Sequence, residues 1–246
     1  MNRSVQQKIG VSLVFGCMLF QLQAMEVKRM ETNGQQYVVA RLDLNKDVLA
    51  LFQNGADGQP LRSFEALQVH LRRQGSELAV GMNAGMFTTD FKALGLCISK
   101  GVELVSLNKN SGQGNFYWKP NGVFYMDGSG AHICKTEEFN SGRIKLATQS
   151  GPLLMWSGQI HPGFKTSTSR KIRNAVGIQD SNRVVLVLSE SRVTFYELAV
   201  LLRELGCRDA LFLDGEICGL YAPQLGRIDQ NVQLGPMLAV VRKTRH

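Results

Sequence analysis

Hydrophobic and polar residues alternate with clear periods in the first part of the chain. Residues 37–52 (YVVARLDLNKDVLALF) contain stretches of period two, which are typical of half-buried strands. Residues 61–74 carry apolar side chains at helical spacing, and Gly75 follows them as a suitable helix stop. Residues 78–82 (LAVGM) are almost entirely apolar and predict a buried strand.

Turn signals dominate the middle of the chain. Residues 115–118 and 123–126 flank a Lys-Pro-Asn-Gly turn, and this arrangement predicts a hairpin. A second turn, Asp-Gly-Ser-Gly, leads into a further apolar segment at residues 131–134. The pattern indicates an antiparallel meander.

The last part of the chain combines strands with one clear helix. Strands are predicted at residues 175–179, 184–189, 210–213 and 237–241. Thr194 and Glu197 have the T-x-x-E spacing of a capping box, and leucines at helical spacing follow them up to Gly206. The strand at 210–213 delivers Asp214 to its C-terminal tip.

These elements predict an α+β (mixed α/β) domain with a large, mixed or mostly antiparallel sheet flanked by helices. No linker or low-complexity tract divides residues 25–246. Their 222 residues are enough for one domain with a sizeable core, so we expect a single domain over this range.

Residues 1–24 have the pattern of an export signal. Two basic residues precede the apolar segment 9–20, and Ala24 offers a cleavage site. The apolar segment is shorter than the roughly 18 residues that a membrane span needs. We therefore expect a periplasmic or secreted bacterial protein with no transmembrane span after signal removal. The alternatives are a lipoprotein anchor at Cys17 and a short buried helix.

Net charge adds little to this interpretation. The first 24 residues hold two of the 28 basic residues and none of the 20 acidic ones, so the rest of the chain carries a formal charge of +6. Such an excess suits an anionic substrate or an anionic cell envelope, and it is equally compatible with an ordinary surface. No basic block is interleaved with aromatic residues, so a nucleic-acid partner is not favoured.

Four cysteines follow the expected signal, at positions 97, 134, 207 and 218. Export would allow disulfides among Cys97, Cys134, Cys207 and Cys218, with three full connectivities. Isolated buried thiols are the alternative. The sequence contains no C-x-x-C, nucleophile-elbow, dinucleotide-binding, Walker or H-E-x-x-H motif, so no organic cofactor is supported.

Two candidate ligand-binding segments have small or polar residues beside expected strands. Asn83 follows a buried strand and offers hydrogen bonds to a sugar hydroxyl or a phosphate oxygen, while Gly85 lets the backbone approach a ligand closely. A structural Asx turn is the alternative. Ser150 precedes Gly-Pro in a segment whose donors suit an anion, although an ordinary loop has the same composition.

Charged candidates lie near two later strands. Arg173 directly precedes a strand and is suited to grip a phosphate with two parallel N–H bonds, whereas Arg170 fits either substrate binding or a solvated surface. Asp214 and Glu216 flank Gly215, which we assign to substrate binding. If the strand continues, both carboxylates point to one face, as glycosyl hydrolysis by paired carboxylates requires. The alternative is that Asp214 caps its own turn.

In these segments the sequence resembles the phosphodiester glycosidase family. The motifs of that family occur in order at Asn83–Phe87, Gly95-Leu96, Ser150–Pro152, Arg173–Gly177 and Leu213–Gly215. The resemblance spans about residues 80–220 and implies that Asn83, Arg173 and Asp214 belong to the active site; Glu216 rests on chemistry alone. Asp and Asn oxygens also suit a divalent cation, Ca²⁺ or Mg²⁺.

The chain departs from the family pattern directly after Gly215. A relative with a known reaction has two further glycines and a serine there, where this chain has Glu-Ile-Cys. The expected activity is hydrolysis of a glycosidic bond to a phosphate ester in envelope or extracellular glycans. The rivals are a non-catalytic glycan-binding protein on the same scaffold and a phosphodiesterase that cuts the P–O bond.

Overall fold

The computed structural model describes residues 25–244. The export signal and the lipid anchor at Cys17 fall outside the described residues and stay predictions. None of the helices in the described part of the chain has the length and apolar character needed to cross a membrane.

The largest element is a seven-stranded sheet with the order β1-β2-β13-β12-β14-β10-β11. Its strands are β1 (Glu26–Thr32), β2 (Gln35–Asp43), β10 (Leu153–Trp156), β11 (Gln159–Ile160), β12 (Asn174–Asp180), β13 (Arg183–Ser189) and β14 (Asp209–Asp214). All neighbouring strands in it are antiparallel.

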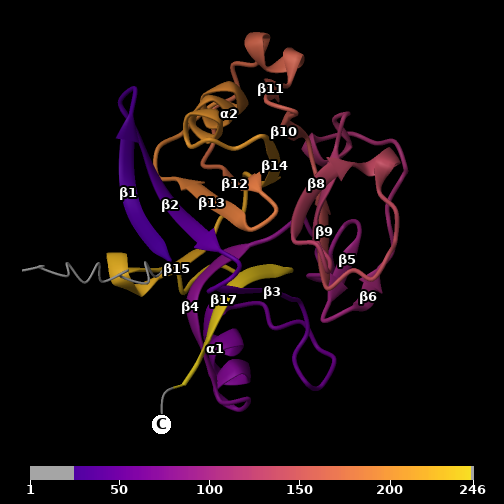
Figure 1. Ribbon diagram of the computed structural model, residues 1–246, viewed down its shortest axis with the longest axis vertical. Helices are drawn as coiled ribbons and strands as arrows, with labels where there is room; N and C mark the ends of the chain where they lie inside the picture. Colours follow the sequence, from indigo (N-terminus) through magenta and orange to yellow (C-terminus); the bar gives the residue numbers. More distant parts are fainter. Residues whose placement is uncertain (1–24, 245–246) are drawn as a thin grey trace, which may run out of the picture.

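Two five-stranded antiparallel sheets complete the β-structure. One has the order β16-β15-β4-β17-β3, with β3 (Val48–Phe52), β4 (Ser76–Asn83), β15 (Leu220–Ala222), β16 (Arg227–Ile228) and β17 (Met237–Lys243). The other has the order β6-β5-β9-β7-β8, with β5 (Cys97–Ser99), β6 (Val102–Val105), β7 (Gly122–Met126), β8 (Ala131–Lys135) and β9 (Leu146–Ser150). Figure 1 shows this second sheet on the right, beside the other two.

The three sheets share one hydrophobic core. A single cluster of buried side chains includes Val80 from β4, Phe124 from β7 and Leu211 from β14. Burial of apolar surface contributes about 25 cal/mol per Å², so a shared core ties the sheets together energetically. The strand ends that meet around this core are therefore held in fixed relative positions.

The two α-helices of the described residues begin at side-chain caps. Ser63 accepts a hydrogen bond from Ala66 at the start of α1 (Phe64–Arg72). Thr194 and Glu197 form a complete capping box at the start of α2 (Phe195–Glu204), as the T-x-x-E pattern predicts. Helix α2 buries its apolar stripe against the seven-stranded sheet.

Removing the Thr194 cap should weaken the fold measurably. We expect Thr194→Ala to lower the free energy of unfolding by about 1 kcal/mol, because an N–H at the start of α2 loses its acceptor. Urea unfolding measures this change. Thr194→Ser keeps the hydroxyl and should stay close to the wild type; equal losses in both variants would contradict the capping explanation.

The predicted fold is confirmed only in its coarser features. The structure combines helices with antiparallel sheets, but it is mainly β, and its strands form three sheets where one large sheet was expected. The hairpin predicted from residues 115–118 is also wrong. Residues Asn115–Tyr117 form a 3₁₀ turn, and the Asn121 side chain takes the Phe116 carbonyl that a strand would use in its ladder. The strand β7 pairs with β8 instead.

Candidate functional site

The candidate site lies where strand ends from all three sheets come together. Asn83 is the last residue of β4, Ser150 the last of β9 and Asp214 the last of β14, while Asn174 is the first of β12. All four side chains are buried. Hydrogen bonds between side chains and backbone cross from one sheet to another at this point, so the site depends on the packing of the sheets.

A pair of asparagines connects β4 with β14. Asn174 Nδ2 donates to both Asn83 Oδ1 and Asn83 O, each at 2.9 Å. The backbone N–H of Asp214 donates to Asn174 Oδ1 at 2.7 Å, and that of Gly219 donates to Asn83 Oδ1 at 3.0 Å. Asn83 Nδ2 is buried and has no partner among the described residues. The bridge therefore leaves the NH₂ group of Asn83 free.

Sequence reasoning missed Asn174. The residue matters because it lies opposite Asp214 in the pairing of β12 with β14. A sequence without its strand register does not show that pairing. The one available signal is its position between Arg173 and an apolar strand, which is not specific.

The Asp214 carboxyl both caps its own turn and carries a shifted pKa. Its Oδ1 accepts hydrogen bonds from the backbone N–H of Gly215 at 2.6 Å and of Glu216 at 3.0 Å. Only 7% of the residue is exposed, and this burial raises the pKa of Asp214 above its usual range, although the turn N–H groups oppose the change. Asp214 therefore caps its own turn and also has a perturbed pKa, as carboxyl groups in active sites commonly do.

Arg173 is a buried cation without an anionic partner in the described residues. Its guanidinium lies over the ring of Phe195, at 3.7 Å from the ring centroid. Nε donates to Val193 O at 2.9 Å and Nη2 to Ser169 O at 3.0 Å, but Nη1 has no partner in residues 25–244. Burial lowers the pKa of Arg173 to about 10, so the group stays charged at neutral pH.

The loop from Gly215 to Gly219 borders Arg173 at its start and Asn83 at its end. Arg173 Nη1 lies 3.4 Å from the position that a Cβ on Gly215 would take, and Gly219 contacts Asn83. Cys218 lies in this loop, and the charges of both Asp214 and Arg173 act on its thiol. Burial, with a contribution from Asp214, raises the pKa of the Cys218 thiol to about 12, which makes it a poor nucleophile.

The cysteines are present as free thiols. Cys97 and Cys207 are buried, and Cys134 and Cys218 are partly buried. Of the two alternatives that the sequence leaves open, disulfides and isolated thiols, the described residues therefore show isolated thiols. Desolvation by the apolar core raises the pKa of Cys97 and of Cys207 to about 12.

Two further predicted site residues support the strand ends. Ser150 Oγ donates to Leu213 O at 2.7 Å, so its hydroxyl joins β9 to β14. The Gly85 N–H donates to Thr148 Oγ1 at 3.0 Å. A Cβ on Gly85 would overlap Gln149 O, which explains why glycine is needed for this close approach.

The close approach at Gly85 gives a testable consequence. We expect Gly85→Ala to lower the free energy of unfolding by about 1–3 kcal/mol, because the added methyl forces the segment that follows β4 away from Gln149 on β9. Gly142→Ala is the matched control, since a Cβ there meets nothing within 4 Å and its backbone is not in the left-handed region. Similar urea midpoints for both variants would contradict the explanation.

The remaining predicted residues lie apart from this centre. Strand β14 ends at Asp214, so the expected continuation that would align Glu216 with it does not occur. The Glu216 side chain is 79% exposed and lies 3.5 Å from Lys171. Arg170 is exposed and pairs with Glu197 on helix α2 at 3.0 Å. Glu216 nevertheless adds a charge that raises the Asp214 pKa.

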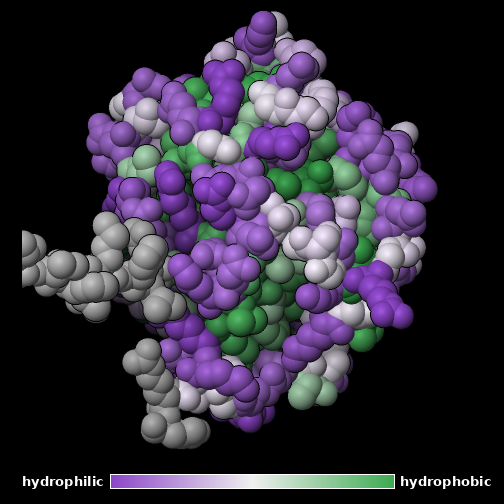
Figure 2. Space-filling view, viewed as in Figure 1, coloured by the Kyte–Doolittle hydropathy of each residue, from purple (hydrophilic) through white to green (hydrophobic). Residues whose placement is uncertain are grey.

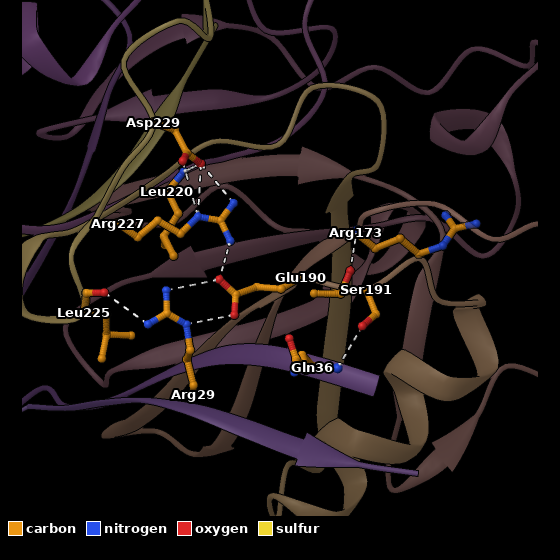
Figure 3. A network of polar contacts seen from close by, with 10 residues as sticks. Arg29, Gln36, Arg173, Glu190, Ser191, Leu220, Leu225, Arg227 and Asp229 are labelled. Atoms are coloured by element: carbon orange, nitrogen blue, oxygen red, sulfur yellow. Dashed lines mark hydrogen bonds and ion pairs between the residues drawn. The ribbon is translucent and has the colours of Figure 1, made fainter. Parts of the chain in front are cut away.

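A charged network anchors the segment that follows the loop, as Figure 3 shows. Glu190 accepts hydrogen bonds from Arg29 and Arg227, both at 3.0 Å. Arg227 also pairs with Asp229 at 3.0 Å, and Asp229 accepts the Leu220 N–H at 2.9 Å. In the same view the Arg173 side chain points away from Glu190. The network therefore fixes the loop but does not neutralise Arg173.

The free atoms of Asn83 and Arg173 are not ligands for a divalent cation. Asn83 Oδ1 already receives two donors, and the unpartnered atoms of Asn83 and Arg173 are N–H groups. Ca²⁺ takes about six to eight oxygen ligands, and Mg²⁺ takes oxygens in octahedral geometry. The described residues contain no group of three or more His, Cys, Asp or Glu arranged for a metal. The arrangement suits an anion.

Comparisons with known proteins identify relatives of the chain. It matches the phosphodiester glycosidase family over residues 76–217. It is also 34% identical over 196 residues to the uncharacterized protein YigE of Escherichia coli (strain K12), covering 78% of this chain and 77% of that protein.

Solved structures with low sequence identity share the fold. The catalytic domain of zebrafish N-acetylglucosamine-1-phosphodiester alpha-N-acetylglucosaminidase, auto-inhibited by its pro-peptide, has a TM-score of 0.60 and 14% identity, covering 88% of this chain and 81% of that domain. A putative exported protein from Burkholderia pseudomallei K96243 has a TM-score of 0.54 and 10% identity, covering 84% and 74% of the two chains.

The family resemblance noted in the sequence is confirmed. The motifs from Asn83 to Gly215 all lie inside the matched range. Because this range covers more than half of the chain, and the relative from E. coli exceeds 30% identity over most of both sequences, the chain belongs to the phosphodiester glycosidase family.

Proposed function

We propose that the protein is an exported hydrolase that cleaves a glycosidic bond to a phosphate ester in envelope or extracellular glycans. One observation carries the proposal. Asn83 Nδ2 and Arg173 Nη1 are buried donors without partners, and both groups border the loop that begins at Asp214. Leaving a buried donor unpaired costs about 1–3 kcal/mol. A phosphodiester offers acceptor oxygens and negative charge, so it satisfies both groups.

The proposed reaction follows from these positions. Arg173 and Asn83 hold the phosphate, and Asp214 acts beside the anomeric carbon, either as a base toward water or as a nucleophile. The C–O bond breaks and its electron pair stays on the phosphate oxygen. Water supplies a hydroxyl to the sugar and a proton to the medium or the phosphate. A pKa raised by burial suits Asp214 to proton transfer nearer neutral pH.

Isotope labelling tests which bond breaks. We expect hydrolysis of a sugar 1-phosphate diester in ¹⁸O-labelled water to place the label in the sugar, because the proposed cleavage is at the C–O bond. Mass analysis of both products measures this. Label in the phosphate would instead identify a phosphodiesterase. Binding of such diesters without turnover of any of them would identify a glycan-binding protein on the same scaffold.

Phosphate alone should stabilise the folded protein. A ligand that binds only the folded state at 100 times its Kd adds about 2.7 kcal/mol to the free energy of unfolding. We expect inorganic phosphate to raise the melting temperature, since it pairs the buried Arg173. A neutral salt at equal ionic strength is the control. An identical shift with chloride would contradict an anion site at Arg173.

Export is supported by the pattern of residues 1–24. Strand β1 begins at Glu26, two residues after the proposed cleavage at Ala24, so cleavage there leaves the described sheet complete. Mass analysis of the mature protein should find Met25 at the N-terminus. A lipid-modified Cys17 would assign the chain to the lipoproteins instead.

A further inference from the structure

Two backbone N–H groups orient the asparagine amides of the site. The Asp214 N–H faces Asn174 at 2.7 Å, and the Gly219 N–H faces Asn83 at 3.0 Å. Because a backbone N–H only donates, each of these groups must meet the carbonyl oxygen of the amide and not its NH₂. The direction of both amides is thereby fixed by the backbone around Asp214.

The fixed direction of Asn174 determines what Asn83 presents. With its oxygen toward Asp214, Asn174 turns its NH₂ to Asn83 and donates to Asn83 Oδ1 at 2.9 Å. Asn83 Oδ1 therefore receives two donors, and the NH₂ of Asn83 is the part of the amide left without a partner in the described residues. A turned-over Asn83 amide would place its NH₂ against two N–H donors, which is electrostatically unfavourable.

We propose that Asn174 is a positioning residue that holds the Asn83 amide with its NH₂ toward the ligand, so that the site selects acceptor oxygens over donor groups. Arg173, which borders the start of the same loop, also offers only donors. The phosphate group of a phosphodiester brings acceptors alone and fits the NH₂ of Asn83, whereas an amine or ammonium group meets a donor there and is rejected. This selectivity deepens the proposed function and rests on the assignment of the ligand site made there.

Two adjacent N–H groups at the end of the loop allow a hydrogen-exchange test in which one serves as the control for the other. The N–H of Gly219 is bonded to Asn83, but the next N–H, that of Leu220, is bonded to Asp229. Asp229 is held by Arg227, which is tied to Glu190, as Figure 3 shows. Two adjacent N–H groups thus report on two different networks, and only the first depends on the Asn83 amide.

Hydrogen exchange of these two groups tests the proposal without any ligand. Asn174→Asp keeps the acceptor for Asp214 N, but an ionised carboxylate attracts the Asn83 NH₂ and turns the amide. We expect hydrogen exchange of the Gly219 N–H to accelerate by about tenfold or more, because this group loses its hydrogen bond to Asn83. The Leu220 N–H should keep its protection. Asn174→Leu, which resembles asparagine in shape, has no acceptor to attract the Asn83 NH₂, so the Gly219 N–H should keep most of its protection in that variant.

A double-mutant cycle then tests the link to the ligand. The dissociation constant of inorganic phosphate is measured by calorimetry for the wild type, Asn174→Asp, Asn83→Ala and the double variant. If Asn174 acts through Asn83, each single change weakens binding about tenfold and the double variant is no weaker than Asn83→Ala. Asn121→Asp is the matched control, since Asn121 is equally buried and bonds to Phe116 O outside the bridge.

Each outcome separates the positioning role from the proposed function. Unchanged exchange at Gly219, equal loss at Gly219 and Leu220, or additive losses of phosphate affinity would each overturn the positioning role. A wild type that does not bind phosphate, together with selective exchange at Gly219, would leave the orientation of Asn83 established and overturn the anion assignment. If Asn174→Asp and Asn121→Asp both bind phosphate weakly, the loss reflects general damage to the fold, and the positioning role of Asn174 is overturned.

Discussion

Asp214→Asn should reduce hydrolysis of a sugar phosphodiester by about 10³-fold, the range in which a positioned acid or base contributes. Asparagine keeps an oxygen for the turn N–H groups of Gly215 and Glu216 but removes the charge that we propose acts on the anomeric carbon. Steady-state rates with a panel of such diesters measure the effect. Glu216→Gln is the control, because its side chain is 79% exposed and it should stay within a few-fold of the wild type.

The same variant should be more stable than the wild type at neutral pH. Burial raises the pKa of Asp214 in the folded state, so the folded protein binds the proton more tightly than the unfolded chain. Stability from this group therefore falls as pH rises from the unfolded value of about 3.9 through the folded pKa. We expect the advantage of Asp214→Asn at pH 7 to disappear below this window. Lower stability at pH 7 together with intact turnover would contradict both parts of the prediction.

Arg173→Lys should weaken binding of inorganic phosphate by about 10- to 150-fold. A hydrogen bond to a charged group contributes about 1.5–3 kcal/mol, and lysine does not reproduce the planar fork of arginine. Lysine also leaves Val193 O or Ser169 O without its present donor. Calorimetry at fixed ionic strength measures the affinity, and urea unfolding reports the cost to the fold.

Arg170→Lys provides the control for this change. Arg170 lies three residues before Arg173, but it is exposed and pairs with Glu197 on helix α2. Both changes preserve the net charge, so screening affects them equally. We expect Arg170→Lys to bind phosphate like the wild type. Equal losses in the two variants would show that general positive charge, and not the buried guanidinium, attracts the anion.

The local elements were predictable because their signals are local. The capping box of Thr194 and the period-two stretches of residues 37–52 need only neighbouring positions, and both give the expected structures. The division into three sheets was not predictable, because it depends on which strands pair. Strand β17, for example, pairs with both β3 and β4, which lie far earlier in the chain.

The residues of the candidate site were also predictable only where their sequence signals are local. Asn83 and Asp214 could be selected since each follows an apolar strand, and the structure connects them through Asn174. Asn174 itself is visible only once β12 is placed in register with β14. Glu216 was proposed on the condition that the strand continues, and the turn that Asp214 caps ends the strand before it.

The bridge between Asn83 and its partners also has a consequence for synthesis of the protein. Asn83 bonds to residues 91 and 136 positions later in the chain, and β4 pairs along its length with the last strand, β17. A nascent chain that has emerged only as far as β14 therefore holds the carboxylate but lacks Gly219, one of the two donors to the Asn83 side chain, and the strand that pairs with β4. We therefore expect the proposed hydrolase activity only from the completed polypeptide, and shortened translation products should be inactive.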